Sequence, residues 1–306
     1  MMSLRYHVVS IAAVLLALAL GVVLGASALS GRVLGALTSD REQLAGQVVA
    51  LRGERDAAEA RLRATEGLVA AGAPSTVAGV LPGRGVAVLA APDADPADVD
   101  AVAGLVESAG GRVTGRLALT DAALAPDQAE ALRALVPRLL PAGAQLPTTT
   151  DTGSLTGSLL GSLLVARPGG AAGEQATGSE ATTALRALAD GGFLRVPDAL
   201  DPVPAELALV VTGGRADPPR DATLTRLAAE VDRVGAGAVV AGRTGSGAVA
   251  AVRADPALRS GLSSVDALEG PASRVATVLA LREQADGRAG TYGPQAGTFI
   301  PQPAAG

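Results

Sequence analysis

The sequence predicts an α/β protein attached to a membrane: a single N-terminal transmembrane helix, a coiled-coil stalk and a mostly parallel three-layer α/β domain. Three observations lead to this fold class: an uncharged apolar stretch, a heptad pattern directly after it, and short apolar strands that alternate with amphipathic helices. The expected divisions are residues 1–30 for the membrane helix, 31–71 for the stalk, 72–84 for a linker, 85–288 for the α/β domain and 289–306 for a disordered tail.

The apolar stretch covers residues 8–29, and no charged residue occurs between Arg5 and Arg32. As a helix it is roughly 33 Å long, against about 30 Å for the hydrocarbon core of a bilayer. A signal peptide cleaved after Ala28 is the alternative, but the stretch is longer than a usual signal core of roughly 7–15 residues. The short segment before the helix favours a cytoplasmic N-terminus. We therefore expect a single-pass protein of the cell membrane or envelope, with its C-terminal domain exported.

Residues 34–69 follow a heptad pattern in which eight of eleven seam positions are apolar. Such a face pairs with another helix or chain. Because anchoring confines all copies to one plane and one orientation, we expect parallel homo-oligomers held by Leu37, Leu44 and Leu51. The alternative is a helix that docks on its own domain. Within the anchor, small residues recur every four positions but lie off this seam: Ala13, Ala17, Gly21 and Gly25.

Composition excludes several classes of function. The net charge of −5 and the pI near 5.0 argue against a nucleic-acid partner, which requires a basic face. The chain has no cysteine, so it forms no disulfide and carries no thiolate nucleophile. It has four aromatic residues, two tyrosines and two phenylalanines, so the core is built from alanine, valine and leucine.

The region after residue 84 alternates strands and helices, which predicts parallel pairing with helices on both faces of the sheet. A helix opens at Asp95-Pro96 and closes at Gly110-Gly111. An apolar piece at 155–165 lies between loops at 144–154 and 167–179. The remaining expected strands are 85–91, 112–120, 206–212 and 237–242, and the remaining expected helices are 126–140, 180–190, 221–234 and 275–285.

In a parallel sheet, ligands bind beyond the carboxyl ends of the strands. The loops there contain Pro92-Asp93, Thr120-Asp121, Gly213-Gly214-Arg215 and the segment 242–247. Glycine with arginine is able to cradle an anion, but neither glycine-rich loop matches a dinucleotide-binding or Walker A spacing, so we expect ordinary strand-to-helix turns in preference to an anion site. The exported region has no histidine, which excludes a Ser-His-Asp triad. We expect no catalytic and no cofactor-binding residues, and therefore no enzyme.

Both ends of the chain carry recognisable motifs. Residues 3–10 read Ser-Leu-Arg-Tyr-His-Val-Val-Ser, residues 264–266 read Ser-Val-Asp, and residues 275–281 form a Val-Ala-Thr-Val-Leu-Ala-Leu helix before Gly-Arg-Ala-Gly-Thr-Tyr-Gly at 287–293. These segments resemble the actinobacterial copper transporter family of MctB type, although Ser264 stands where that family usually has threonine. The resemblance implies an envelope membrane protein linked to copper efflux or homeostasis, sometimes described as pore-forming.

The residues themselves do not explain copper chemistry. Copper sites use thiolate, thioether or imidazole ligands, and the chain offers only Met1, Met2 and His7, all at the entrance to the membrane helix. Copper is therefore expected as a transported ion and not as a cofactor, with its ligands unknown. We expect His7 to be an interfacial residue beside Tyr6, and a ligand role is the alternative.

Two further questions stay open at this stage. Ser264 and Asp266 are interpreted as a turn or helix cap in preference to ligands, because short oxygens satisfy free backbone N–H groups. One apolar helix lines no aqueous path unless several copies assemble. The alternative function is a structural or interaction protein that presents its α/β domain to envelope partners without transport activity.

Overall fold

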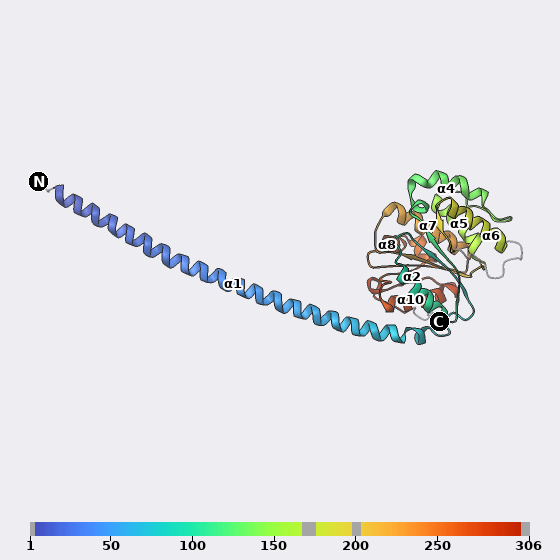
Figure 1. Ribbon diagram of the computed structural model, residues 1–306, viewed down its shortest axis with the longest axis horizontal. Helices are drawn as coiled ribbons and strands as arrows, with labels where there is room; N and C mark the ends of the chain where they lie inside the picture. The colour runs from blue at the N-terminus through green and yellow to red at the C-terminus, as the bar shows by residue number, and fades with distance from the viewer. Residues whose placement is uncertain (1–3, 167–175, 198–202, 301–306) are drawn as a thin grey trace. The chain divides into compact units, whose positions relative to one another are not determined.

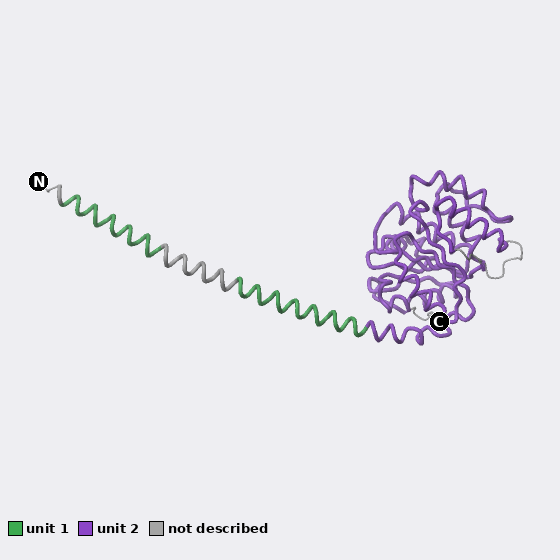
Figure 2. The backbone as a smooth tube through the Cα atoms, viewed as in Figure 1, with its two compact units in different colours: residues 1–65 green, residues 66–306 purple. Residues whose placement is uncertain are grey.

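The computed structural model describes residues 4–166, 176–197 and 203–300. It divides into two compact units, residues 1–65 and residues 66–306 (Figure 2).

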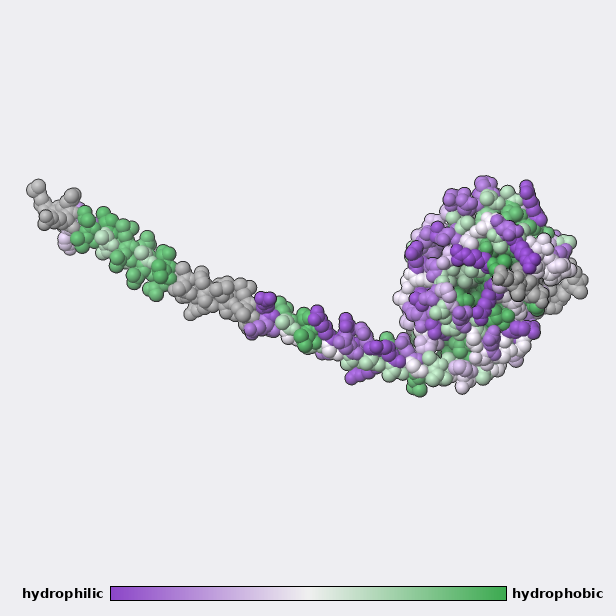
Figure 3. Space-filling model, viewed as in Figure 1, coloured by the Kyte–Doolittle hydropathy of each residue, from purple (hydrophilic) through white to green (hydrophobic). Residues whose placement is uncertain are grey.

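The first unit is part of one long helix, α1 (Leu4–Val77). Its segment Tyr6–Gly25 has a mean hydropathy of 2.8 and is wholly exposed, and by length and composition it is able to cross a membrane. Figure 3 shows this segment as a continuous hydrophobic surface, whereas the surface from residue 41 onward is mixed. The expected N-terminal apolar helix is thus present.

The C-terminal end of α1 belongs to the second unit and corrects the expected linker. We expected the glycines and Pro74 to end the helix near residue 72, but α1 continues to Val77. Ala73 and Val77 are buried in an apolar cluster with Leu81. This packing outweighs the low helix propensity of proline and glycine at the end of the helix.

The second unit is built on a seven-stranded sheet in the order β3-β2-β1-β4-β5-β6-β7. All neighbouring strands described are parallel except β2 and β3, so the sheet is mixed and the predicted α/β class is confirmed. The strands are β1 (Gly85–Ala90), β2 (Arg112–Leu119), β3 (Leu194–Arg195), β4 (Leu207–Thr212), β5 (Ala238–Gly242), β6 (Ser263–Val265) and β7 (Thr291–Tyr292).

Helices cover both faces of the sheet (Figure 1). One core cluster contains residues of α2 (Pro96–Ser108), α10 (Pro271–Ala285) and the end of α1. The other contains residues of α5 (Thr152–Leu164), α6 (Gly178–Asp190), α7 (Pro218–Val234) and α8 (Gly247–Ala254). Short elements complete the unit: α3 (Asp121–Leu124), η1 (Pro126–Gln128), α4 (Ala129–Leu135), η2 (Val136–Arg138) and α9 (Pro256–Gly261).

Three expectations for this unit were wrong in detail. The helix expected at 126–140 is divided into η1, α4 and η2, and Pro137 lies in the last of these. The apolar piece at 155–165 is the buried helix α5, which begins at Thr152. It packs closely on α7, because a Cβ at Gly157 would lie within 3.0 Å of the Leu227 backbone.

The tail expected after residue 289 is not a tail in its described part. It forms β7, which pairs with β6, and then η3 (Pro294–Ala296). Tyr292 is only 4 % exposed and anchors this segment in the apolar cluster that contains α10. Residues 301–306 lie outside the described residues.

Candidate functional site

A cleft lies at the switch point of the sheet, where the helices that follow two neighbouring strands lie on opposite faces. β1 and β4 are neighbours, but the chain leaves β1 for α2 on one face and leaves β4 for α7 on the other. Such a switch point leaves a crevice beyond the carboxyl ends of the two strands, which is where ligands of α/β proteins bind. The structure places the predicted segments Pro92-Asp93 and 212–215 together at this crevice.

The cleft has a volume of about 210 Å³. Apolar side chains of α3 and α7 form part of its wall, and the rest is charged. The charged residues that line it are Asp93, Asp121, Arg215, Asp217, Arg220 and Asp221. Four aspartates and two arginines give these groups a formal charge of −2, so the cleft favours cations over anions.

One arginine of the cleft is paired and the other is not. Arg220 donates to Asp121 over 2.5 Å and lies 3.4 Å from Asp217. The Arg215 guanidinium makes no hydrogen bond or ion pair with the described residues, and Arg215 is exposed at the cleft mouth.

Asp221 is the most buried acid of the cleft, with 9 % of its surface exposed. It accepts a hydrogen bond from the backbone N–H of Asp217 over 2.7 Å. Burial, together with the nearby charges of Asp217 and Asp93, raises the pKa of Asp221 above its usual range. Negative charge is therefore crowded at the start of α7.

The glycines of the first loop serve close packing. A Cβ at Gly213 would lie within 3.0 Å of the carbonyl and carboxylate oxygens of Asp93. The loop after β4 thus packs closely against the loop after β1, where its neighbouring groups are the carbonyl and the carboxylate of Asp93. The geometry favours ordinary strand-to-helix turns, and the anion cradle finds no support at this loop.

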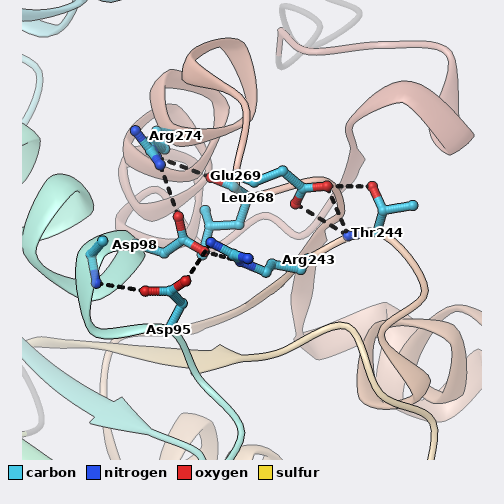
Figure 4. A network of polar contacts seen from close by, with 8 residues as sticks. Asp95, Asp98, Arg243, Thr244, Leu268, Glu269 and Arg274 are labelled. Atoms are coloured by element: carbon cyan, nitrogen blue, oxygen red, sulfur yellow. Dashed lines mark hydrogen bonds and ion pairs between the residues drawn. The ribbon is translucent and has the colours of Figure 1, made fainter.

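The second glycine-rich loop carries Arg243, which is committed to a polar network (Figure 4). Arg243 donates to Asp98 over 2.6 Å and also pairs with Asp95 over 2.6 Å. Arg274 donates to the other carboxylate oxygen of Asp98 over 2.8 Å. These contacts fasten the loop after β5 to the first turns of α2 and α10, so Arg243 has a structural role.

Asp98 is the centre of this network and is only 1 % exposed. Burial opposes its charged form, but the hydrogen bonds and positive charges of Arg243 and Arg274 outweigh this effect and lower the pKa of Asp98. The local sequence gave no sign of this role, because Arg243 is 145 residues away along the chain.

Ser264 and Asp266 hold the C-terminal segment in place. Arg253 donates to the Ser264 hydroxyl over 3.3 Å, to Asp266 over 3.1 Å and to the Tyr292 carbonyl over 2.7 Å. The second carboxylate oxygen of Asp266 accepts the backbone N–H of Gln295 over 3.1 Å. Asp266 therefore acts as a cap for η3: it accepts the backbone N–H of Gln295 and not an N–H group in its own turn.

The same end of the sheet contains a second buried polar pair. The Tyr292 hydroxyl donates to the Glu283 carboxylate of α10, and both residues are buried. Burial and this hydrogen bond to Glu283 raise the pKa of Tyr292. The motif at 287–293 thus supplies the contacts that close the sheet at β7.

Among the residues that the structure describes, no three histidine, aspartate or glutamate side chains converge to hold a metal ion. His7 is exposed on α1 within the apolar segment. Met1 and Met2 lie outside the described residues.

Comparison with known proteins shows that the resemblance is not confined to the two terminal motifs but covers nearly the whole chain. A family model described as "Copper transport outer membrane protein, MctB" matches residues 1–301. The chain is 37 % identical over 305 residues to the copper transporter MctB of Mycobacterium tuberculosis H37Rv, with 96 % of each chain covered. It is 36 % identical over 310 residues to the copper transporter MctB of Mycobacterium leprae, again with 96 % of each covered.

Proposed function

Because the chain belongs to the MctB family of copper transport proteins, we propose that it is a membrane-anchored envelope protein that acts in copper efflux or copper tolerance. The observation that carries this proposal is the family match over residues 1–301. The lack of histidine in residues 8–306 leaves no base for a Ser-His-Asp triad in the proposed exported domain.

The proposed topology has a cytoplasmic N-terminus, a span at Tyr6–Gly25 and an exported α/β domain. The length and hydropathy of this segment support it. Carbonate extraction should leave the protein in membranes, and protease added outside the cell membrane should degrade the α/β domain. A mature N-terminus at Leu29 would instead indicate a cleaved signal peptide.

Copper enters the proposal as cargo. The soft donors of the sequence are Met1, Met2 and His7, within its first seven residues, whereas the α/β domain offers carboxylate oxygens. Carboxylates suit harder ions than Cu(I). We therefore place any direct contact with copper at the N-terminal end of the membrane helix. The domain then supports transport by binding envelope partners or by organising several anchors.

The assembly proposed is a parallel homo-oligomer formed through α1. Its support within the first unit is a row of large apolar side chains that the single chain leaves uncovered: Leu44, Val48, Leu51 and Leu62 are 61, 45, 63 and 58 % exposed. Exchanging both Leu44 and Leu51 for aspartate should abolish chemical cross-linking between subunits and leave the α/β domain folded. Val49→Asp is the matched control, because Val49 is 68 % exposed but lies off the seam.

Deletion of the gene and measurement of cellular copper test the function itself. We expect higher copper accumulation and lower copper tolerance in the deletion strain, with recovery on expression of the parent chain. The seam variant should fail to restore tolerance if several anchors are needed, while Val49→Asp should restore it. Unchanged copper content and tolerance in the deletion strain would favour a structural envelope protein without transport activity.

A further inference from the structure

The stalk part of α1 carries a charged residue where its seam should be apolar. With Leu44 and Leu51 at d positions, the a positions between residues 41 and 65 are Arg41, Val48, Arg55 and Leu62. Arg55 is flanked by Glu54 at a g position and by Glu59 at an e position. In an isolated helix this arrangement would serve no packing role, because water would solvate all three side chains.

In the single chain, the charges around Arg55 are only partly paired. Arg55 lies 2.7 Å from Asp56 and 3.3 Å from Glu59. The side chains of Arg55 and Glu59 are 67 and 54 % exposed. The Glu54 carboxylate makes no hydrogen bond or ion pair with any residue that the structure describes.

We propose that α1 pairs with a second copy of this chain in a two-stranded, parallel, in-register coiled coil, in which Arg55 of each copy forms a charged layer with Glu54 of the other. This inference rests on the oligomer proposed above and names its strand number and register. In a coiled coil, each a-position side chain enters a hole formed by four residues of the facing helix. For Arg55 in register, the hole consists of Leu51, Glu54, Arg55 and Ala58 of the second copy.

The composition of this hole suits a guanidinium group. Glu54 supplies an acceptor, and the small side chain of Ala58 leaves room for Arg55 to turn toward it. Glu54 of one copy would otherwise face Glu59 of the other, which is an unfavourable pair of like charges. Arg55 lies between the two carboxylates and offsets their repulsion.

The same layer selects one register. A shift by one heptad places Arg55 in a hole whose g position is Gln47 or Arg61 instead of Glu54. In the shifted dimer one Arg55 meets Gln47 and the other meets Arg61, so both arginines lose the acidic partner that offsets their positive charge. A charged residue at an a position fixes the register of a coiled coil at some cost in stability.

Strand number and direction follow from neighbouring layers. A β-branched residue at a with leucine at d favours two strands, and Val48 lies between Leu44 and Leu51 in this pattern. Anchoring in one membrane gives both copies the same direction.

Cysteine cross-linking in membranes tests the register, because residues 1–306 contain no cysteine. Leu51→Cys, on the seam, should cross-link efficiently under mild oxidation, and Ala60→Cys, on the opposite face, should not. Coexpressed copies of different tag length, one carrying Leu44→Cys and the other Leu51→Cys, should give few mixed dimers. Their cysteines are one heptad apart, roughly 10 Å along the helix axis.

The charged layer is tested in the same cysteine backgrounds: Leu51→Cys reports association, and the coexpressed Leu44→Cys and Leu51→Cys copies report register. Glu54→Gln with Glu59→Gln should lower the association constant about tenfold, because two guanidinium groups are left in the seam without acidic partners, and should raise the yield of mixed-register dimers. Adding Arg55→Leu should restore association. Glu42→Gln, which removes an acid away from the seam, should change neither quantity.

The outcomes separate the two proposals. No cross-linking of Leu51→Cys would overturn the oligomer itself. Cross-linking that is insensitive to Glu54 and Glu59 would leave the oligomer in place and overturn the charged layer. A trimer mass in mild detergent would overturn the two-stranded arrangement.

Discussion

Asp232 offers a test of the α/β domain in which the pH dependence of stability has a definite sign. It lies in the last turns of α7, and its carboxylate accepts the backbone N–H of Ala238 over 2.8 Å. Burial raises the pKa of Asp232 from 3.8 to about 6, and the hydrogen bond from Ala238 offsets only part of this effect.

The folded state therefore favours the protonated form of Asp232. Its contribution to stability is greatest below pH 3.8, the value for the unfolded chain, and is lost as the pH rises through about 6. At 1.36 kcal/mol for each pH unit between the two values, the loss is about 3 kcal/mol at pH 7 and about 1 kcal/mol at pH 4.5. Asp232→Asn keeps an oxygen for the Ala238 N–H and removes the titration. The variant should exceed the parent in free energy of unfolding by up to these amounts.

Urea unfolding of the full chain in detergent, followed by far-UV circular dichroism at pH 7 and pH 4.5, measures this difference. The advantage of Asp232→Asn over the parent should shrink by about 2 kcal/mol between the two pH values. Asp190→Asn is the control, because Asp190 is exposed at the end of α6 and should show no such change. An advantage that is equal at both pH values, or absent at pH 7, would refute the linkage.

Three further substitutions test contacts described above, each measured by urea unfolding. Asp98→Asn should lower the free energy of unfolding by about 1–2 kcal/mol at pH 7, since Arg274 loses its carboxylate partner and Arg243 keeps only Asp95. Because the pKa of Asp98 is lowered, its contribution is present above pH 3.8 and lost as the pH falls through the lower folded value, and an equal effect near pH 2 would contradict this. Gly213→Ala should cost about 1–3 kcal/mol through overpacking, whereas Gly104→Ala, in open space on α2, should be neutral or stabilising by up to about 1 kcal/mol; equal effects would show that the loop after β4 is not closely packed. Tyr292→Phe should cost about 1–3 kcal/mol because Glu283 loses a buried donor, and an unchanged stability would mean that water replaces the hydroxyl.

The central strands were predictable because their signal is local. β1, β4 and β5 are continuous apolar runs bounded by glycine, proline or charged residues, as expected for strands covered on both faces. β6 and β7 were missed because they have three and two residues and are partly polar. The buried hydroxyl of Ser263 in β6 is satisfied by hydrogen bonds that it accepts from Gln284 and from the backbone N–H of Gly290, which lies 27 residues away.

The position of the candidate site was predictable from the sequence, but the charge of its lining was not. Parallel pairing alone puts the loops after β1 and β4 at one edge of the sheet, and the cleft is there. The sequence favoured ordinary turns over an anion site in the glycine-rich loops, but it did not report that Arg243 after β5 binds Asp98 or that four aspartates line the cleft. Pairings across more than a hundred residues decide these roles, and no local pattern reports them.

Because β7 completes the sheet, the stability of the domain depends on whether the chain continues through residues 291–295. A chain that stops before Thr291 contains Glu283 without the Tyr292 hydroxyl, and Asp266 without the Gln295 N–H. Buried carboxylates that lose their donors destabilise a fold out of proportion to the few residues removed. A chain truncated before Thr291 should therefore unfold at a lower urea concentration than the parent, although it keeps the central strands of the sheet.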